Sequence, residues 1–159
     1  MEFTRPLIYL YVTSPFGFRT HPVTGEQSSF HNGIDLRAVE GSSVYTILPG
    51  TVENVYYNDI GGNQITILHA DGYRSGYAHL KDTLVVPGQN LGPGQLIAYS
   101  GNTGTGTAPH LHFTVKKDGE YIDPETIDYS ITDLVKKNPI KTFLIGASVG
   151  LLLFLYFKK

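Results

Sequence analysis

The chain has 159 residues, which suits one domain of ordinary size, and a formal net charge of −2 with no basic stripe and no run of like charges. This charge pattern argues against nucleic acid as a partner. Cysteine is absent, which excludes disulfides and cysteine-based catalysis, while 18 glycines and 9 prolines among abundant Val, Ile, Thr and Tyr favour short strands joined by turns. We therefore expect a mainly β fold.

The N-terminal segment, residues 1–13, is expected to be a lead-in to this domain. Its apolar run, residues 7–12, is short and interrupted by tyrosines, so it does not predict a secretory signal peptide. Further on, Asn32 and Gly33 separate His31 from Asp35. A His-x3-Asp pair can lie on one helix face, but these two residues weaken helix propensity and resemble a turn. We place the pair on a loop that enters a strand.

Short apolar or alternating runs bounded by turn residues predict the strands that follow. The predicted strands are residues 43–48, 51–57, 64–69, 73–79, 95–100, 110–116 and 121–122. The pairs Asp71-Gly72 and Asp118-Gly119 are typical of hairpin turns. Antiparallel strands of these lengths predict a sheet with a substrate groove, and residues 101–107 would form a loop beside it.

Three histidine segments carry the chemistry of this sequence. His31, Asp35 and His112 would supply two imidazoles and a carboxylate, which is a common ligand set for a catalytic zinc ion with one position left for water. His110 is two residues from His112, so on a strand both side chains leave by the same face. His79 adds an imidazole for proton transfer or for stabilising an oxyanion.

Each histidine of this set also has a structural interpretation. Any one histidine alone is more often a hydrogen-bonded surface or core residue than a ligand, although coincidence of the whole set is much less expected. Two histidines and a carboxylate also form the facial triad of non-haem iron oxygenases, but that chemistry does not require His79 and His110.

From about residue 14 to residue 124 the chain resembles the lysostaphin-type (LytM-like) zinc metallopeptidases, which cut peptide bonds in bacterial peptidoglycan. The resemblance rests on the opening Ser-Pro-Phe-Gly-Phe-Arg-Thr-His-Pro-Val-Thr-Gly at residues 14–25, on His-Asn-Gly-Ile-Asp at residues 31–35 and on Tyr-Ala-His-Leu at residues 77–80. The late signature Ser-Gly-Asn-Thr-Gly-Thr-Gly-Thr-Ala-Pro-His-Leu-His-Phe at residues 100–113 completes it.

The resemblance implies a zinc metallopeptidase domain over residues 14–127 with one Zn²⁺ per site. It makes His31, Asp35 and His112 the metal ligands and His79 and His110 the catalytic pair. The implied reaction is hydrolysis of a peptidoglycan peptide bond by a zinc-activated water, and the sequence does not decide which imidazole is the base. Inactive relatives serve as scaffolds or activators, but they have typically lost a metal ligand, and none is lost here.

Two further histidines receive structural interpretations. His21 lies in the opening segment and would line the substrate groove, whereas His69 ends an apolar alternating strand. Neither is predicted to be a site residue.

The C-terminal segment predicts a membrane anchor. After a linker over residues 128–139, the chain from residue 142 to residue 157 carries no charge and is dominated by Leu, Ile, Phe and Val. As a helix, residues 139–157 would extend for about 28 Å, just enough for the hydrocarbon core of a bilayer if Lys158 and Lys159 snorkel. We expect residues 140–159 to be a single-pass transmembrane helix, and the spacing of Gly146 and Gly150 would allow two such helices to self-associate. A buried helix of a larger assembly or an interfacial helix is the alternative.

The expected location follows from the anchor and from the lack of a recognisable export signal. One hypothesis is the internal membrane of a bacteriophage virion, where the enzyme would contact virion proteins and open the cell wall during genome delivery. The other is a bacterial cell envelope. Lysines flank both ends of the apolar segment, so charge gives no orientation.

Overall fold

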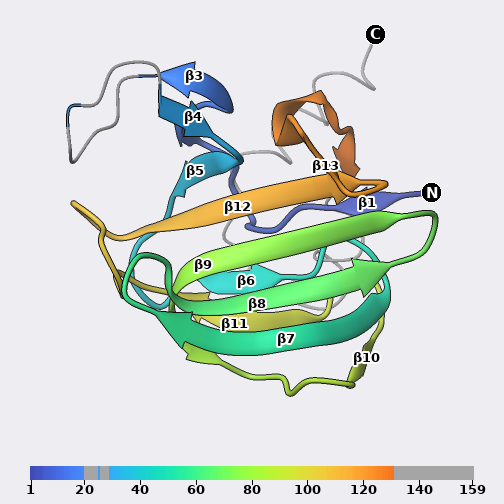
Figure 1. The fold of residues 1–159 in the computed structure, drawn as a ribbon. Coiled ribbons are helices and arrows are strands. Elements are labelled where there is room, and N and C mark those ends of the chain that lie inside the picture. The colour runs from blue at the N-terminus through green and yellow to red at the C-terminus, as the bar shows by residue number, and fades with distance from the viewer. Residues whose placement is uncertain (20–24, 26–28, 131–159) are drawn as a thin grey trace, which may run out of the picture.

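The structure, a computed structural model, describes residues 1–19, 25 and 29–130 (Figure 1). Within these ranges the regular secondary structure is all β strand apart from one short 3₁₀ helix, η1 (Pro124–Thr126). No helix there is long and apolar enough to cross a membrane. The predicted anchor, residues 140–159 with Gly146 and Gly150, and His21 lie outside the described residues.

The strands of the described residues are short at the N-terminal end and long in the middle of the chain. They are β1 (Phe3–Thr4), β2 (Val12–Ser14), β3 (Gly17–Arg19), β4 (Ser29–His31), β5 (Ile34–Arg37), β6 (Ser43–Tyr45), β7 (Gly50–Asn58), β8 (Gly62–His69), β9 (Tyr73–Thr83), β10 (Asn90–Leu91), β11 (Leu96–Ser100), β12 (His110–Lys117), β13 (Glu120–Ile122) and β14 (Tyr129–Ser130).

One antiparallel sheet dominates the described part of the chain, with the order β10-β7-β8-β9-β12-β5-β2. Strand β13 pairs with β12, while β11 pairs with both β6 and the end of β9. Two small sheets stand beside it: the hairpin β3–β4, which projects above β5 in Figure 1, and the parallel pair of β1 with β14. That last pair brings the two ends of the described chain together. The prediction of a mainly β, antiparallel sheet is confirmed.

Packing in the core explains why apolar and polar residues alternate along the long strands. On β12, Leu111, Phe113 and Val115 are fully buried, and they pack in one cluster with apolar residues of β8, β9 and β11 such as Ile65, Tyr77 and Ile97. Residues at the alternate positions therefore face outward, because successive side chains of a strand point to opposite faces. This outward face carries the polar residues of the groove.

Most of the predicted strands match observed ones to within a few residues, and the long hairpins β7–β8 and β8–β9 lie where the apolar alternation placed them. The predicted strand over residues 43–48 is wrong in its second half, because β6 ends at Tyr45. There the hydroxyl of Thr46 donates to the carbonyl of Leu48 and the chain bends. Six short strands carry too few residues for any periodicity and were not predicted: β1, β2, β3, β4, β10 and β14.

The two Asp-Gly turns are confirmed. Asp71 and Gly72, which join β8 to β9, have φ values of 54° and 74°, and Asp118 and Gly119, which join β12 to β13, have values of 51° and 91°. Positive φ at both central residues is the signature of the type I′ turn that matches the twist of a hairpin.

Candidate metal centre and active site

Strand pairing assembles the three predicted ligands. Asp35 on β5 lies directly opposite His112 on β12, and His112 also lies opposite Ala78 on β9. Directly opposed residues of antiparallel strands project to the same face and come within contact distance. The predicted placement of His31 and Asp35 on a loop is wrong, because His31 ends β4 and Asp35 lies in β5. The bend at Asn32 and Gly33 joins these two strands and brings His31 beside the pair.

The three ligand atoms form a small triangle. His31 Nε2 lies 3.2 Å from Asp35 Oδ1, His112 Nδ1 lies 2.8 Å from the same oxygen, and the two nitrogens are 3.1 Å apart. Zinc bonds of about 2.0–2.1 Å in a tetrahedral site place ligand atoms about 3.3 Å apart. The spacing of this triangle fits such an ion.

The tautomers of the His31 and His112 imidazoles also favour the binding of a cation between these side chains and Asp35. His31 Nδ1 lies 2.8 Å from the carbonyl oxygen of Pro15, and His112 Nε2 lies 3.2 Å from the amide oxygen of Asn32. Because oxygens of carbonyl groups can only accept, these two nitrogens carry the protons, and the lone pairs of His31 Nε2 and His112 Nδ1 face the carboxylate of Asp35. Three lone-pair atoms this close repel one another unless a proton or a metal cation lies among them. Such outer hydrogen bonds are also typical of metal-bound histidines.

The carboxylate is held in the ionised form that a ligand needs. Burial by itself raises the pKa of Asp35, but the contacts of its carboxylate with His112 and His31 outweigh burial and hold the pKa well below its ordinary value. The guanidinium of Arg19 lies 3.8 Å from Asp35 Oδ2, the oxygen that faces away from the two imidazoles.

His79 and His110 stand together beside the triangle. Their ring centroids are 4.4 Å apart, and His110 Nε2 lies 3.9 Å from Asp35 Oδ1. In each ring Nδ1 lies 2.8 Å from a backbone carbonyl oxygen, that of Thr103 for His79 and that of Ala108 for His110. Each Nδ1 therefore donates, and each Nε2 is left with a lone pair for a substrate or a water.

The backbone at His79 is held in a left-handed conformation, with φ at 59°. This conformation costs about 1–3 kcal/mol for a residue other than glycine, and such strain gathers at functional sites. A 2.7 Å hydrogen bond from His79 N to the carbonyl of Gly61 helps to hold it. Burial lowers the pKa of His79, so its imidazole is neutral near pH 7.

All five predicted site residues line one groove. The groove has a volume of about 880 Å³, and its rim includes Thr105, Gly106 and Thr107 of the loop that the sequence placed beside the site. His69 lies elsewhere, buried between the carbonyl of Pro49 and the hydroxyl of Ser75.

Two site residues were missed by the sequence analysis, Asn32 and Arg19. Asn32 stands inside the His-x-Gly-x-Asp motif, so its position was a signal that it faces the same centre. Arg19 stands inside the opening motif at residues 14–25, but that motif did not indicate its contact with Asp35, which depends on how the hairpin β3–β4 folds.

The sequence that forms this site matches a known protein family. A sequence profile described as Peptidase family M23 matches residues 29–124, more than half of the chain, and this range holds every predicted site residue. The chain belongs to peptidase family M23. The resemblance predicted from the motifs is thereby confirmed.

Relatives in family M23 agree in sequence and in fold. The peptidoglycan DD-endopeptidase ShyC of Vibrio cholerae is 35% identical over 143 residues, covering 89% of this chain and 33% of that protein. A zinc-containing peptidase from Vibrio cholerae has a TM-score of 0.74 and 37% identity, over 82% of this chain and 41% of the other. The catalytic domain of lysostaphin from Staphylococcus simulans has a TM-score of 0.65 and 31% identity, over 74% and 90%.

The fold is therefore lysostaphin-like. The chain spans only about a quarter to a third of the length of the curated relatives that it matches.

Proposed function

We propose that this chain is a zinc-dependent endopeptidase that cleaves peptides of bacterial peptidoglycan. The observation that carries the proposal is the triangle of lone-pair atoms with edges of 2.8–3.2 Å, set beside two imidazoles whose free nitrogens face the same groove. Membership of family M23, the DD-endopeptidase activity named for ShyC, and similarity to a zinc-containing peptidase support it.

In this proposal His31, Asp35 and His112 hold the zinc ion. The chemistry that zinc supplies when bound is to lower the pKa of a water to near neutrality and to polarise a carbonyl group. Asn32 and the carbonyl of Pro15 fix the rings that present the ligand nitrogens.

His79 and His110 are the proposed catalytic residues. As a water attacks the peptide carbonyl carbon, Nε2 of one imidazole accepts the proton of the water, and the imidazolium so formed donates a hydrogen bond to the developing oxyanion. When the C–N bond breaks, the imidazolium gives its proton to the departing amine nitrogen. The neutral state of His79 near pH 7 suits it to accept the first proton.

We further propose that the bond cleaved lies in a peptide cross-link or in a stem peptide. The names of ShyC and of the Neisseria DD-carboxypeptidase/endopeptidase Mpg, 33% identical over 131 residues, support a DD-type cross-link as the first substrate to test.

The test is digestion of purified peptidoglycan by the full chain, with and without a zinc chelator, followed by mass spectrometry of the released fragments. We expect new amino termini whose release stops with the chelator and returns with zinc. The alanine variants Asp35→Ala and His112→Ala should lose zinc and activity together. Retained activity in the His112 variant would overturn the ligand assignment.

Two other function classes give different results in the same assay. A peptidoglycan-binding or scaffold protein of this fold would bind walls of several chemical types without releasing fragments. An iron oxygenase with the same facial triad would need iron and dioxygen, whereas a zinc peptidase works without oxygen.

The arrangement along the whole chain is also a proposal. We propose a lead-in over residues 1–13, a peptidase domain over residues 14–127, a linker over residues 128–139 and a membrane anchor over residues 140–159. The charge-free, apolar sequence from residue 142 to residue 157 supports the anchor. Deleting residues 138–159 should release an active protein from membranes, and a truncated chain that stayed in the membrane fraction would contradict the anchor.

The proposed location is the internal membrane of a phage virion, with a bacterial envelope as the second candidate. Fractionation of purified particles and host membranes separates the two, since the virion proposal requires the protein to be present in the particles.

A further inference from the structure

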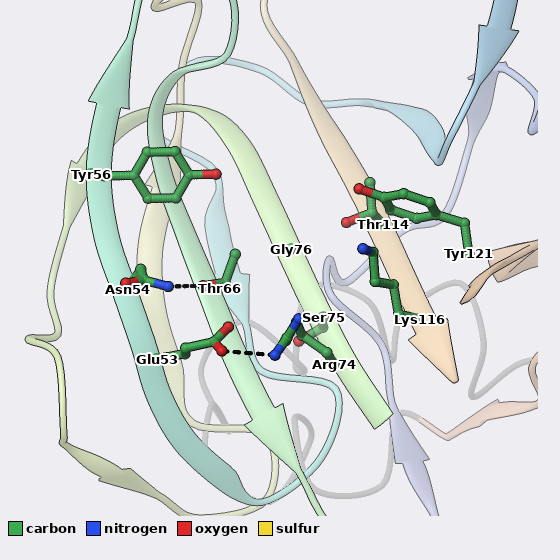
Figure 2. Close-up of a pocket in the computed structure, with 10 residues that line it drawn as sticks. All are labelled: Glu53, Asn54, Tyr56, Thr66, Arg74, Ser75, Gly76, Thr114, Lys116 and Tyr121. Carbon is green, nitrogen blue, oxygen red and sulfur yellow. Dashed lines mark hydrogen bonds and ion pairs between the residues drawn. The ribbon is translucent and has the colours of Figure 1, made fainter. Parts of the chain in front are cut away.

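A second cavity, of about 490 Å³, is lined by residues of β7, β8, β9, β12 and β13 (Figure 2). On β12 the side chains of His110, His112, Thr114 and Lys116 alternate with the buried Leu111, Phe113 and Val115, so the first four share one face. At about 3.3 Å per residue, Lys116 lies roughly 13 Å along the strand from His112. An extended peptide advances by the same rise, so this distance corresponds to about four of its residues.

Small residues of β9 lie beneath the two cavities. Ala78 pairs with His112 beneath the metal groove, and Gly76 pairs with Thr114 beneath the second cavity. A Cβ atom at Gly76 would come within 2.5 Å of Thr114 Oγ1, so a larger residue there would have to displace the Thr114 side chain. Gly76 and Ala78, the two smallest residues of β9, therefore leave room for a substrate to pass from one cavity to the other. We call the space above these two residues the passage.

Tyrosines flank this passage. Figure 2 shows Tyr56 of β7 and Tyr121 of β13 on opposite sides of Gly76, with their rings directed toward one another. The hydroxyl of Tyr56 donates a 3.1 Å hydrogen bond to Gln64, which lines the metal groove. This contact links the lining of the second cavity to that of the metal groove.

The far end of the passage carries two cations and one carboxylate. Arg74 pairs with Glu53 at 2.7 Å, while the ammonium of Lys116 lies 4.2 Å from the centre of the Tyr121 ring. Within the described residues no carboxylate lies within ion-pair distance of Lys116. The two cations and one carboxylate therefore leave one positive charge for a ligand.

We propose that Arg74 and Lys116 form a carboxylate-binding subsite that selects the peptide substrate, roughly 13 Å from the metal centre. The inference rests on the proposed function, because it assumes that the peptide lies along this face of the sheet. An anion is the ligand that an uncompensated Lys binds best, beside an Arg that pairs with Glu53 through one guanidinium nitrogen, and peptidoglycan peptides carry free carboxylates. Glu53 competes for Arg74, which sets the affinity of the subsite.

The experiment uses the zinc-loaded full chain and two cross-linked stem-peptide dimers that differ only in having free or amidated carboxylates. We expect the KM for the amidated dimer to be about tenfold higher with kcat unchanged, as suits the loss of one charge-assisted contact. Lys116→Gln should raise the KM for the free-carboxylate dimer by a similar factor and leave that for the amidated dimer within about twofold. Glu53→Gln should lower the KM for the free-carboxylate dimer.

Lys117→Gln is the matched control. Lys117 is the next residue on β12, and its side chain points to the other face, where its ammonium lies 4.6 Å from the Tyr73 ring. This variant removes the same charge and should leave both KM values within about twofold of the wild type.

Equal KM values for the two dimers, or equal effects of Lys116→Gln on both, would overturn the subsite. If the wild type cleaved neither dimer, the proposed function would fail for these substrates. The affinities of the two uncleaved dimers, measured by calorimetry, would still decide the subsite, because equal affinities contradict it and weaker binding of the amidated dimer supports it.

Discussion

Replacing Asn32 by alanine should weaken zinc binding without removing any ligand. The amide oxygen of Asn32 lies 3.2 Å from His112 Nε2 and thereby keeps the proton on that nitrogen and the lone pair on Nδ1, which faces Asp35. Without this acceptor the ring of His112 is free to rotate and to exchange tautomers. Zinc then binds a less organised set of ligands, and its affinity falls.

The size of the effect follows from the position of Asn32 just outside the ligands. Loss of such an outer hydrogen bond typically lowers metal affinity by about 10–100-fold, which equals about 1.4–2.7 kcal/mol. The assay is competition for zinc between the protein and a chromophoric chelator. Asn32→Asp, which keeps an acceptor oxygen, should bind zinc at least as tightly as the wild type.

Asn54→Ala is the control for this experiment. Asn54 lies on the outward face of β7, where its amide donates to the hydroxyl of Thr66, away from the metal ligands. An Asn32→Ala protein that binds zinc as tightly as the wild type and as Asn54→Ala would refute the tautomer argument for His112.

Three further predictions concern other parts of the chain. His79→Ala should keep its zinc but lose turnover of peptidoglycan by about 10²–10⁴-fold, as measured by metal content and fragment release, because it removes a proton-transfer group and no ligand. Burial lowers the pKa of His69. The unfolded chain therefore takes up this proton first as pH falls below about 6.5, and urea unfolding should show a loss of stability there that is smaller in His69→Gln. Phe113→Ala, which empties a fully buried site on β12, should lower the free energy of unfolding by about 3–5 kcal/mol in the same assay.

Each of these predictions has an outcome that contradicts it. Loss of zinc from His79→Ala would make that residue a ligand. Identical pH profiles for the wild type and His69→Gln would mean that His69 titrates alike in both states. Tyr57, 60% exposed, is the aromatic control for Phe113, and Tyr57→Ala should cost less than about 0.5 kcal/mol. A loss of comparable size at both positions would contradict the assignment of the core.

Local sequence was enough to predict the features that depend on neighbouring residues. The alternation of β12 places His110 and His112 on one face because the side-chain period of a strand is two. Asp71-Gly72 and Asp118-Gly119 predict type I′ turns because these residues tolerate positive φ. The residue types of His31, Asp35 and His112 identified them as candidate ligands, since two imidazoles and one carboxylate are a set of donors that zinc prefers.

Tertiary structure decided what depends on residues far apart in the chain. The pairing of β5 with β12 brings Asp35 within 2.8 Å of His112, and no local pattern specifies that register. The proton positions of the site imidazoles depend on carbonyl groups of distant segments, such as that of Thr103 for His79. The left-handed backbone of His79 and the passage over Gly76 likewise arise only where strands pack together. The sequence by itself determined which chemical groups are present, and the packing of strands determined their distances and tautomers, because these are set by contacts between segments that the chain order does not make neighbours.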